Sequence, residues 1–134
     1  MREIIFRGKD PESGEWYYGY YVKRNDGDRG YLILEDYYLE SYEIVKPETI
    51  CQYTGLTDKN GTKIFEGDIV HMNSKKFGLS GHGLVVFWNG GFAIDDRKRK
   101  RLYPFMQNGQ YNAGDYRVDC NIYDNPELME VRNG

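Results

Sequence analysis

Turn motifs that contain glycine separate short runs rich in Tyr, Ile, Val and Phe. This alternation of turns and strand-like segments restricts the possible fold more than any other feature. The motifs are Asp26-Gly27, Asn60-Gly61, Asn89-Gly90-Gly91 and Asn108-Gly109. Asn and Gly tolerate the positive φ angles that tight hairpin turns require, while β-branched and aromatic residues favour strands. The pattern therefore predicts a mostly-β chain, arranged as a meander or a barrel of antiparallel strands.

The clearest predicted hairpin joins Leu84–Trp88 to Phe92–Asp96 through Asn89-Gly90-Gly91. Helix is expected only in one or two short segments, at Leu34–Tyr42 and at Asn125–Glu130, where Asn125 would be the N-cap. Further strands with partial alternation are predicted at Ile4–Gly8, Trp16–Lys23, Tyr31–Glu35, Thr49–Tyr53, Asp68–Asn73, Leu102–Phe105 and Tyr116–Asn121.

The chain length allows one compact domain or two very small lobes, because 134 residues bury a limited core. Pro47 would end any preceding helix, so we place a boundary there, with an amino-terminal β lobe over residues 1–48 and a carboxy-terminal lobe over 49–134. Gly67-Asp68 precedes a β-branched pair, as in small SH3-like barrels, so the second lobe is expected to be barrel-like. One continuous domain is the alternative.

The strand Leu84–Trp88 is apolar at every position rather than at alternate ones. Such a strand should be covered on both faces, and one cover could be a second subunit. The 13 tyrosines supply apolar area that serves interfaces as readily as cores. We therefore expect a homo-oligomer that associates through Leu84, Val86 and Trp88.

A basic run, Arg97-Lys98-Arg99-Lys100-Arg101, stands out in an acidic chain. Because the net charge is −3 and this run carries +5, all other residues sum to −8. The run could contact nucleic acid, with Tyr103 stacking on a base. We favour a solvated hairpin tip or a charged edge strand instead, because the acidic remainder would repel the same phosphates.

The sequence contains cysteines and histidines that could bind zinc, but they do not form a zinc-binding motif. Structural zinc sites use close pairs such as Cys-x-x-Cys, whereas Cys51, His71, His82 and Cys120 are all far apart in the chain. We interpret the cysteines as buried small apolar residues and the histidines as loop residues, and we predict neither a metal nor a cofactor.

No catalytic constellation is apparent, and the chain is predicted not to be an enzyme. Ser80-Gly81-His82-Gly83 is interpreted as a flexible loop, since nucleophile and base seldom align when they are sequence neighbours. Among the paired acids, Asp68 can accept backbone N–H bonds in a turn beside Glu66, and Asp95-Asp96 adjoins cations that keep both acids ionised. The phosphate-loop patterns do not occur.

The start of the sequence has no apolar stretch behind a basic segment, and no run is long enough to span a bilayer. With only two cysteines, the expectation is a cytoplasmic protein with reduced thiols and no membrane contact.

Three segments carry a resemblance to a known family. The stretch Ile50–Val70, with the opening Met1–Gly8 and the closing Asn121–Leu128, resembles the YopX family, small proteins encoded by phages and by prophages in bacterial genomes. The family has no established activity or catalytic residues to carry over, so the resemblance implies a phage or prophage origin of the protein and no particular chemistry. We expect a phage or prophage accessory protein in the bacterial host cytoplasm that acts by binding as a non-catalytic homo-oligomer, with a host protein as a further possible partner. Nucleic-acid binding through residues 97–101 is the alternative, and an unrecognised enzyme comes third.

Overall fold

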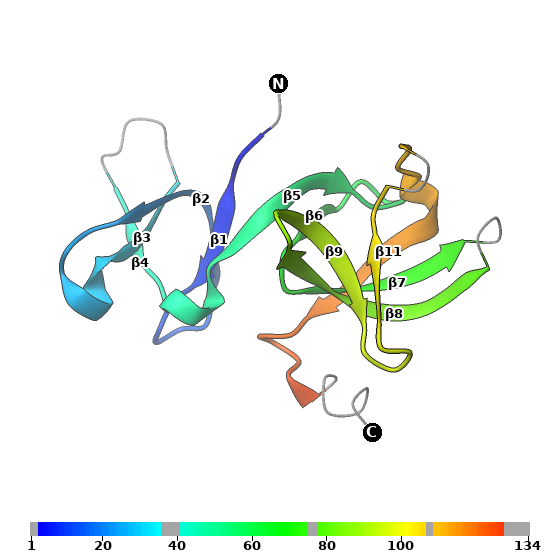
Figure 1. The fold of residues 1–134 in the computed structure, drawn as a ribbon. Helices are drawn as coiled ribbons and strands as arrows, with labels where there is room; N and C mark the ends of the chain where they lie inside the picture. Colours follow the sequence, from blue (N-terminus) through cyan, green and yellow to red (C-terminus); the bar gives the residue numbers. More distant parts are fainter. Residues whose placement is uncertain (1–2, 36–40, 75–77, 107–108, 128–134) are drawn as a thin grey trace. The chain divides into compact units, whose positions relative to one another are not determined.

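The computed structural model describes residues 3–35, 41–74, 78–106 and 109–127. Within these ranges the chain is mostly β, with antiparallel sheets and short 3-10 turns, which confirms the predicted fold class. The chain forms two compact units, Met1–Gly55 and Leu56–Gly134, whereas the sequence suggested a division between residues 48 and 49 (Figure 1). No helix in the described part has the length and the apolar character to cross a membrane.

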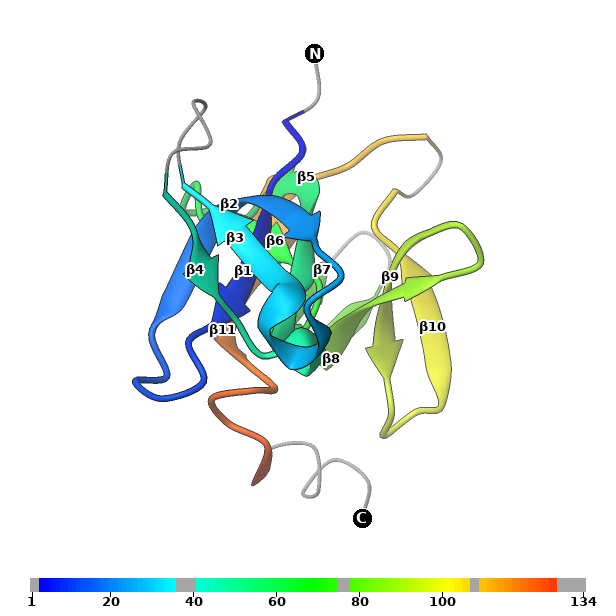
Figure 2. The ribbon, with the colours of Figure 1, turned by 90° about the vertical axis from the view of Figure 1, so that its left-hand side faces the viewer.

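The amino-terminal unit is an antiparallel meander (Figure 2). Neighbouring strands follow one another in sequence in the order β4-β3-β2-β1, and the first residues of β5 pair with the other side of β1. Its most deeply buried side chains include Leu32, Ile33 and Val45. The strands are β1 (Phe6–Lys9), β2 (Trp16–Lys23), β3 (Tyr31–Leu34), β4 (Glu43–Ile44) and β5 (Cys51–Thr57), with 3-10 turns η1 (Gly27–Gly30) and η2 (Pro47–Thr49).

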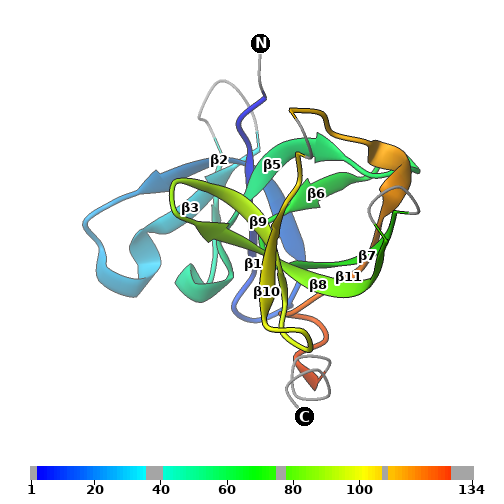
Figure 3. The same cartoon turned by 45° about the vertical axis from the view of Figure 1, so that its right-hand side comes forward.

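The carboxy-terminal unit is built on a five-stranded sheet in the order β10-β9-β8-β7-β11 (Figure 3). In the described residues this sheet stays open, with β10 and β11 as its edges, so the barrel-like lobe does not close. The elements are β6 (Lys63–Phe65), β7 (Asp68–Ser74), β8 (Leu79–Trp88), β9 (Gly91–Asp96), β10 (Arg101–Pro104), η3 (Ala113–Asp115) and β11 (Tyr116–Asn121).

Side chains on the two faces of this sheet form two apolar clusters, as alternation along a strand requires. The outer cluster is smaller: Ile69 and Leu84 are buried there, and partly buried neighbours pack against them. We call the larger cluster the inner core; its buried members are Ile64, Val70, Met72, Val85, Ile94, Phe105 and Tyr116.

The predicted hairpin between β8 and β9 is confirmed. Trp88 pairs with Gly91, so the turn consists of Asn89 and Gly90, whose φ angles are 52° and 85°. Positive φ at both central residues is the type I′ geometry that matches the twist of the flanking strands.

The flexible loop predicted at residues 80–83 is wrong, because β8 already begins at Leu79. Gly83 is buried, and a β-carbon added there would overlap the Cγ2 of Ile94 on the neighbouring strand. Glycine therefore lets β9 pack closely against β8 at this point, although glycines flanking a histidine look like a loop in sequence.

The other predicted strands are present with small changes at their ends, and β2 and β11 have the predicted bounds. Two short strands, β4 and β6, were not predicted. Leu34 ends β3, and most of the helix expected over Leu34–Tyr42 lies outside the described residues, as does the second half of Asn125–Glu130.

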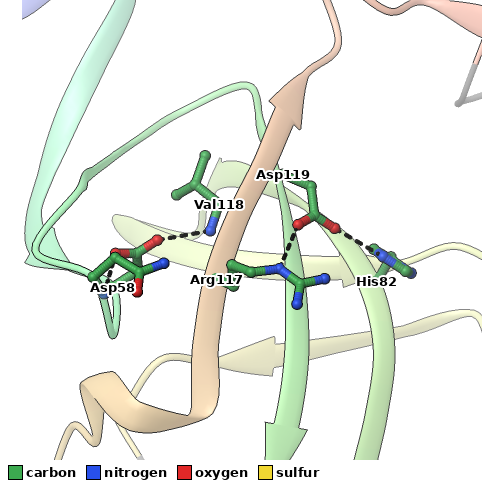
Figure 4. A network of polar contacts seen from close by, with 6 residues as sticks. Asp58, His82, Arg117, Val118 and Asp119 are labelled. Atoms are coloured by element: carbon green, nitrogen blue, oxygen red, sulfur yellow. Dashed lines mark hydrogen bonds and ion pairs between the residues drawn. The ribbon is translucent and has the colours of Figure 1, made fainter.

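The Ile50–Val70 segment holds the carboxy-terminal unit together through its acidic residues. Asp58 is 3% exposed, and its carboxylate accepts hydrogen bonds from the N–H groups of Asn60 (2.8 Å) and Thr62 (2.9 Å) in its own turn and of Val118 (2.9 Å) on β11 (Figure 4). Asp68 accepts from the N–H of Phe65 at 2.8 Å, which confirms its predicted turn role. These carboxylates are structural acceptors.

Candidate binding surfaces of the carboxy-terminal unit

The end of the β8–β9 hairpin exposes two aromatic side chains. Phe87 is 55% exposed and Trp88 is 56% exposed. Successive strand residues point to opposite faces, so Trp88 shares a face with Val86 and Leu84, while the Phe87 ring contacts Phe92 with 5.3 Å between ring centroids. Leu84 is buried and Val86 is half-buried. Within the described chain, the first residues of the predicted apolar strand are therefore covered by other side chains, whereas Phe87 and Trp88 at its end are exposed to solvent.

The first four residues of the basic run form the turn between β9 and β10, its last residue, Arg101, begins β10, and all five side chains are exposed. Two of its arginines bind the chain itself. Arg97 Nε lies 3.3 Å from Asp95 Oδ2, and Arg99 Nη1 lies 3.0 Å from the buried Asp96 Oδ2. Arg99 Nη1 also donates to the carbonyl of Ser80 at 2.7 Å. Asp95 and Asp96 thus anchor this hairpin tip.

The remaining cations of the tip are Lys98, Lys100 and Arg101. In the part of the chain that the structure describes, none of the three forms an ion pair. Tyr103, the proposed stacking residue, is half-buried and packs against the inner core. The exposed basic charge is therefore available, whereas the tyrosine ring is partly covered.

A polar row on the outer face of the sheet was not predicted. His82 on β8 pairs with His71 on β7, and His71 pairs with Arg117 on β11, so the three side chains lie side by side across three strands. The two imidazole centroids are 4.8 Å apart, with the rings edge to face. Asp119 sits at a β-bulge between Val118 and Cys120. We call His71, His82 and Arg117 the histidine–arginine row.

Asp119 is the carboxylate partner of both ends of this row (Figure 4). Its Oδ1 accepts from Arg117 Nε at 2.7 Å, and its Oδ2 lies 3.0 Å from His82 Nε2. Burial alone would raise the pKa of Asp119, but the hydrogen bonds and charges of Arg117 and His82 lower it overall. The same contact raises the pKa of Arg117. Asp119 and Arg117 are therefore both ionised at neutral pH.

His71 has the opposite environment, since cations outnumber carboxylates around it. Its pKa lies below the usual value, first because of burial and then because of the positive charges of His82 and Arg117. Asp119 opposes these effects, and Lys59 adds to them. The row thus holds one permanent positive charge, on Arg117, with the carboxylate of Asp119 beside both of its ends.

The placement of both histidines on loops is wrong, since His71 lies in β7 and His82 in β8. The structure brings these two histidines together but leaves Cys51 in the other unit. Among the described residues, no group of three or more His, Cys, Asp and Glu side chains could hold a metal ion. The sequence does contain a signal for a strand here, because the polar residues Ser80 and His82 alternate with glycines, as polar and non-polar positions do in a half-buried strand.

Comparison with known proteins agrees with this architecture. The crystal structure of protein EF1440 from Enterococcus faecalis is similar, with a TM-score of 0.59 and 26% sequence identity, over 96% of this chain and 99% of that one. No curated protein matches the sequence. The family described as YopX protein matches residues 5–130, which is nearly the whole chain. This chain therefore belongs to the YopX family.

Proposed function

We propose that this protein is a phage or prophage accessory protein that acts by binding, without catalysis, as a homo-oligomer in the bacterial host cytoplasm. The observation that supports self-association is the uncovered end of the β8–β9 hairpin, where Phe87 and Trp88 are both more than half exposed. Large aromatic rings at a strand end are frequent anchors of protein interfaces. The proposed contact surface is Leu84, Val86 and Trp88, with Trp88 and Val86 supplying its accessible area.

The expected affinity is modest. Covering the half-exposed Trp88 ring contributes about 1–1.5 kcal/mol, and covering the half-buried Val86 contributes roughly 0.5 kcal/mol. A two-fold contact covers both residues of both copies, which gives roughly 3–4 kcal/mol in total. Ordering and lost translational freedom offset part of this gain. Association is therefore expected only at about millimolar chain concentration.

Light scattering from about 10 µM to 1 mM tests the proposal, with a mass above one chain expected at the upper end. Val86→Lys places a charge in the contact and should return the protein to a monomer. The matched control is Tyr20→Ser, which removes a 45% exposed ring from β2 in the other unit and should leave the mass unchanged. A monomer mass throughout the range contradicts the proposal. If Tyr20→Ser lowers the mass as much as Val86→Lys does, the hairpin end is not the interface.

Nucleic-acid binding is the second candidate, because Lys98, Lys100 and Arg101 are exposed and make no ion pair within the described residues. Three phosphate contacts would give a log–log salt slope of roughly −3, and five would give roughly −4.5. Binding to single-stranded and double-stranded oligonucleotides at two salt concentrations decides between the candidates. We expect weak binding or none, and tight, salt-sensitive binding that the triple serine variant of these residues loses would reverse the order.

A further inference from the structure

We propose that the histidine–arginine row is one wall of a binding site for a single phosphate group. The site is a hollow of about 100 Å³ on the outer face of the sheet, lined by Lys59, His71, Asn73 and Arg117 together with the segment 114–116. It is independent of the hairpin end proposed above for self-association.

The strand register sets the site apart from the Asp119 contact. The row crosses β7 at His71. Asp119 lies beside the part of β7 that precedes His71, near Ile69. Asn73, and Tyr116 which pairs with Met72, lie beside the part of β7 that follows His71. Tyr116 belongs to the lining of the hollow and Asp119 does not. Arg117 and His71 thus have a carboxylate on one side and an open hollow on the other.

The groups around the hollow are hydrogen-bond donors that the described chain leaves available. Arg117 uses its Nε for Asp119, and no described residue accepts from its two Nη groups. The Lys59 ammonium and the Asn73 side-chain amide likewise make no hydrogen bond or ion pair in the described part of the chain. The Lys59 main chain donates to the Tyr116 carbonyl at 3.1 Å, which holds the lysine beside the hollow. Guanidinium, ammonium and imidazole together are the donor set that binds phosphate oxygens.

The size of the hollow limits what it can hold. Sites for drug-sized ligands occupy roughly 300–1,000 Å³, so about 100 Å³ accommodates one tetrahedral anion and leaves the rest of any larger ligand in solvent. Asp115 also lines the hollow and opposes an anion. The permanent charges of Lys59 and Arg117 are therefore nearly balanced by Asp115 and Asp119, and the net positive charge of the site depends on the histidines.

Anion binding and histidine protonation are therefore coupled. His71 faces His82, Arg117 and Lys59, whose positive charges disfavour its protonated form, and Asp119, which favours that form. A phosphate group in the hollow adds negative charge, so it favours protonated His71, and by linkage protonation of His71 tightens phosphate binding. For an anion of constant charge, such as sulfate, affinity should increase as the pH falls from about 7.5 to 6, whereas inorganic phosphate gains a proton in this range and its own loss of charge opposes the increase.

The test is a titration of the full chain with inorganic phosphate at about pH 6, followed through the His71 ring proton resonances by NMR. The expected result is a saturable shift together with a raised apparent pKa of His71. Sulfate, which keeps its double charge across this pH range, should reproduce the shift, and sodium chloride at equal ionic strength should not.

Two arginine variants separate a built site from general screening. Arg117→Gln should weaken phosphate binding at least about tenfold, because it removes the paired Nη donors. Arg24→Gln removes an exposed arginine of the other unit, paired with Asp26, and should leave the affinity unchanged. If Arg117→Gln disturbs the spectrum as a whole, Lys59→Gln replaces it, since the Lys59 side chain is exposed.

The proposal is overturned by the absence of a saturable His71 shift up to about 50 mM phosphate, or by equal losses in the Arg117 and Arg24 variants. A further arm uses a short single-stranded oligonucleotide. Tighter binding than inorganic phosphate, still dependent on Arg117, identifies a nucleic-acid phosphate as the source. Oligonucleotide binding no tighter than phosphate identifies a free phosphate group or that of a small molecule.

Discussion

Replacing Asp58 should destabilise the carboxy-terminal unit, because its buried carboxylate joins the turn at residues 58–62 to β11. In Asp58→Ala the N–H of Val118, which is partly buried, loses its acceptor at a cost of about 1–3 kcal/mol. The N–H groups of Asn60 and Thr62 are exposed, so water replaces the carboxylate there and each loss is only about 0.5–1 kcal/mol. The total is about 2–5 kcal/mol, out of the roughly 5–15 kcal/mol typical of a domain.

Asp58→Asn is the sharper variant, because it keeps the shape and one oxygen. That oxygen can still accept from the turn, but the amide nitrogen then faces the Val118 N–H, donor against donor. We expect a loss of about 2–3 kcal/mol, measured as a lower urea midpoint by circular dichroism and as faster hydrogen exchange of the Val118 amide.

The acid dependence of stability provides a second measure of the same contact. Burial opposes it, but the N–H donors of Val118, Asn60 and Thr62 lower the pKa of Asp58 overall. A lowered folded-state pKa means that the stabilisation is complete above the unfolded value of about 3.9 and is lost as the pH falls through the folded-state pKa. The wild-type protein should lose this contribution in that acidic window, and Asp58→Asn should not.

The matched control is Asp10→Asn in the amino-terminal unit. Asp10 Oδ1 also accepts from two turn N–H groups, those of Glu12 (2.8 Å) and Ser13 (3.0 Å), in an exposed turn. Its Oδ2 accepts from the Tyr17 hydroxyl on nearby β2 at 3.0 Å, and that hydroxyl can also accept from an amide, so Asn keeps this contact. The control should show a much smaller loss. Equal losses in the two variants, or a change below about 0.5 kcal/mol in Asp58→Asn, would refute the role of the Val118 contact.

Three further predictions concern the turns and the row. Asn89→Val should destabilise the unit by about 1–2 kcal/mol in urea unfolding, because a β-branched residue resists φ near 52°, whereas Asn89→Gly should be tolerated. Arg99→Ser leaves the buried Asp96 without its guanidinium and should cost about 1–2 kcal/mol, while Lys98→Ser should change stability by less than about 0.5 kcal/mol. Because the pKa of His71 is lowered in the folded state, stability should fall as the pH drops below about 6.5, and His71→Gln should reduce this dependence in urea midpoints at pH values on either side of that value.

The parts of the fold that sequence could predict are those that depend on local chemistry. Asn89-Gly90 determines its hairpin because few other residues adopt two consecutive positive φ angles. The bounds of β2 and β11 follow from runs of aromatic and β-branched residues. In contrast, β4 and β6 contain two and three residues, too few for alternation to be recognised.

The candidate site could not be predicted because it depends on register between distant strands. His71 and Arg117 become neighbours only when β11 pairs with β7, and the bulge at Asp119 turns that carboxylate toward His82. Nothing local to β11 indicates this pairing. The beginning of β8 was missed for a related reason, since Gly83 suits a tight contact with Ile94 that exists only in the folded sheet.

The central segment that carries the family resemblance contains residues that hold the fold together. Within Ile50–Val70, Asp58 links its turn to β11, Asp68 closes the turn before β7, and the Gly67 N–H donates to the Val85 carbonyl at 2.8 Å. Of the groups with available donors around the hollow, Lys59 lies within that segment, His71 directly follows it, and Arg117 lies far from it. The family match, which spans residues 5–130, is evidence for a shared scaffold, and the binding chemistry has to be tested at the row and at the hairpin end.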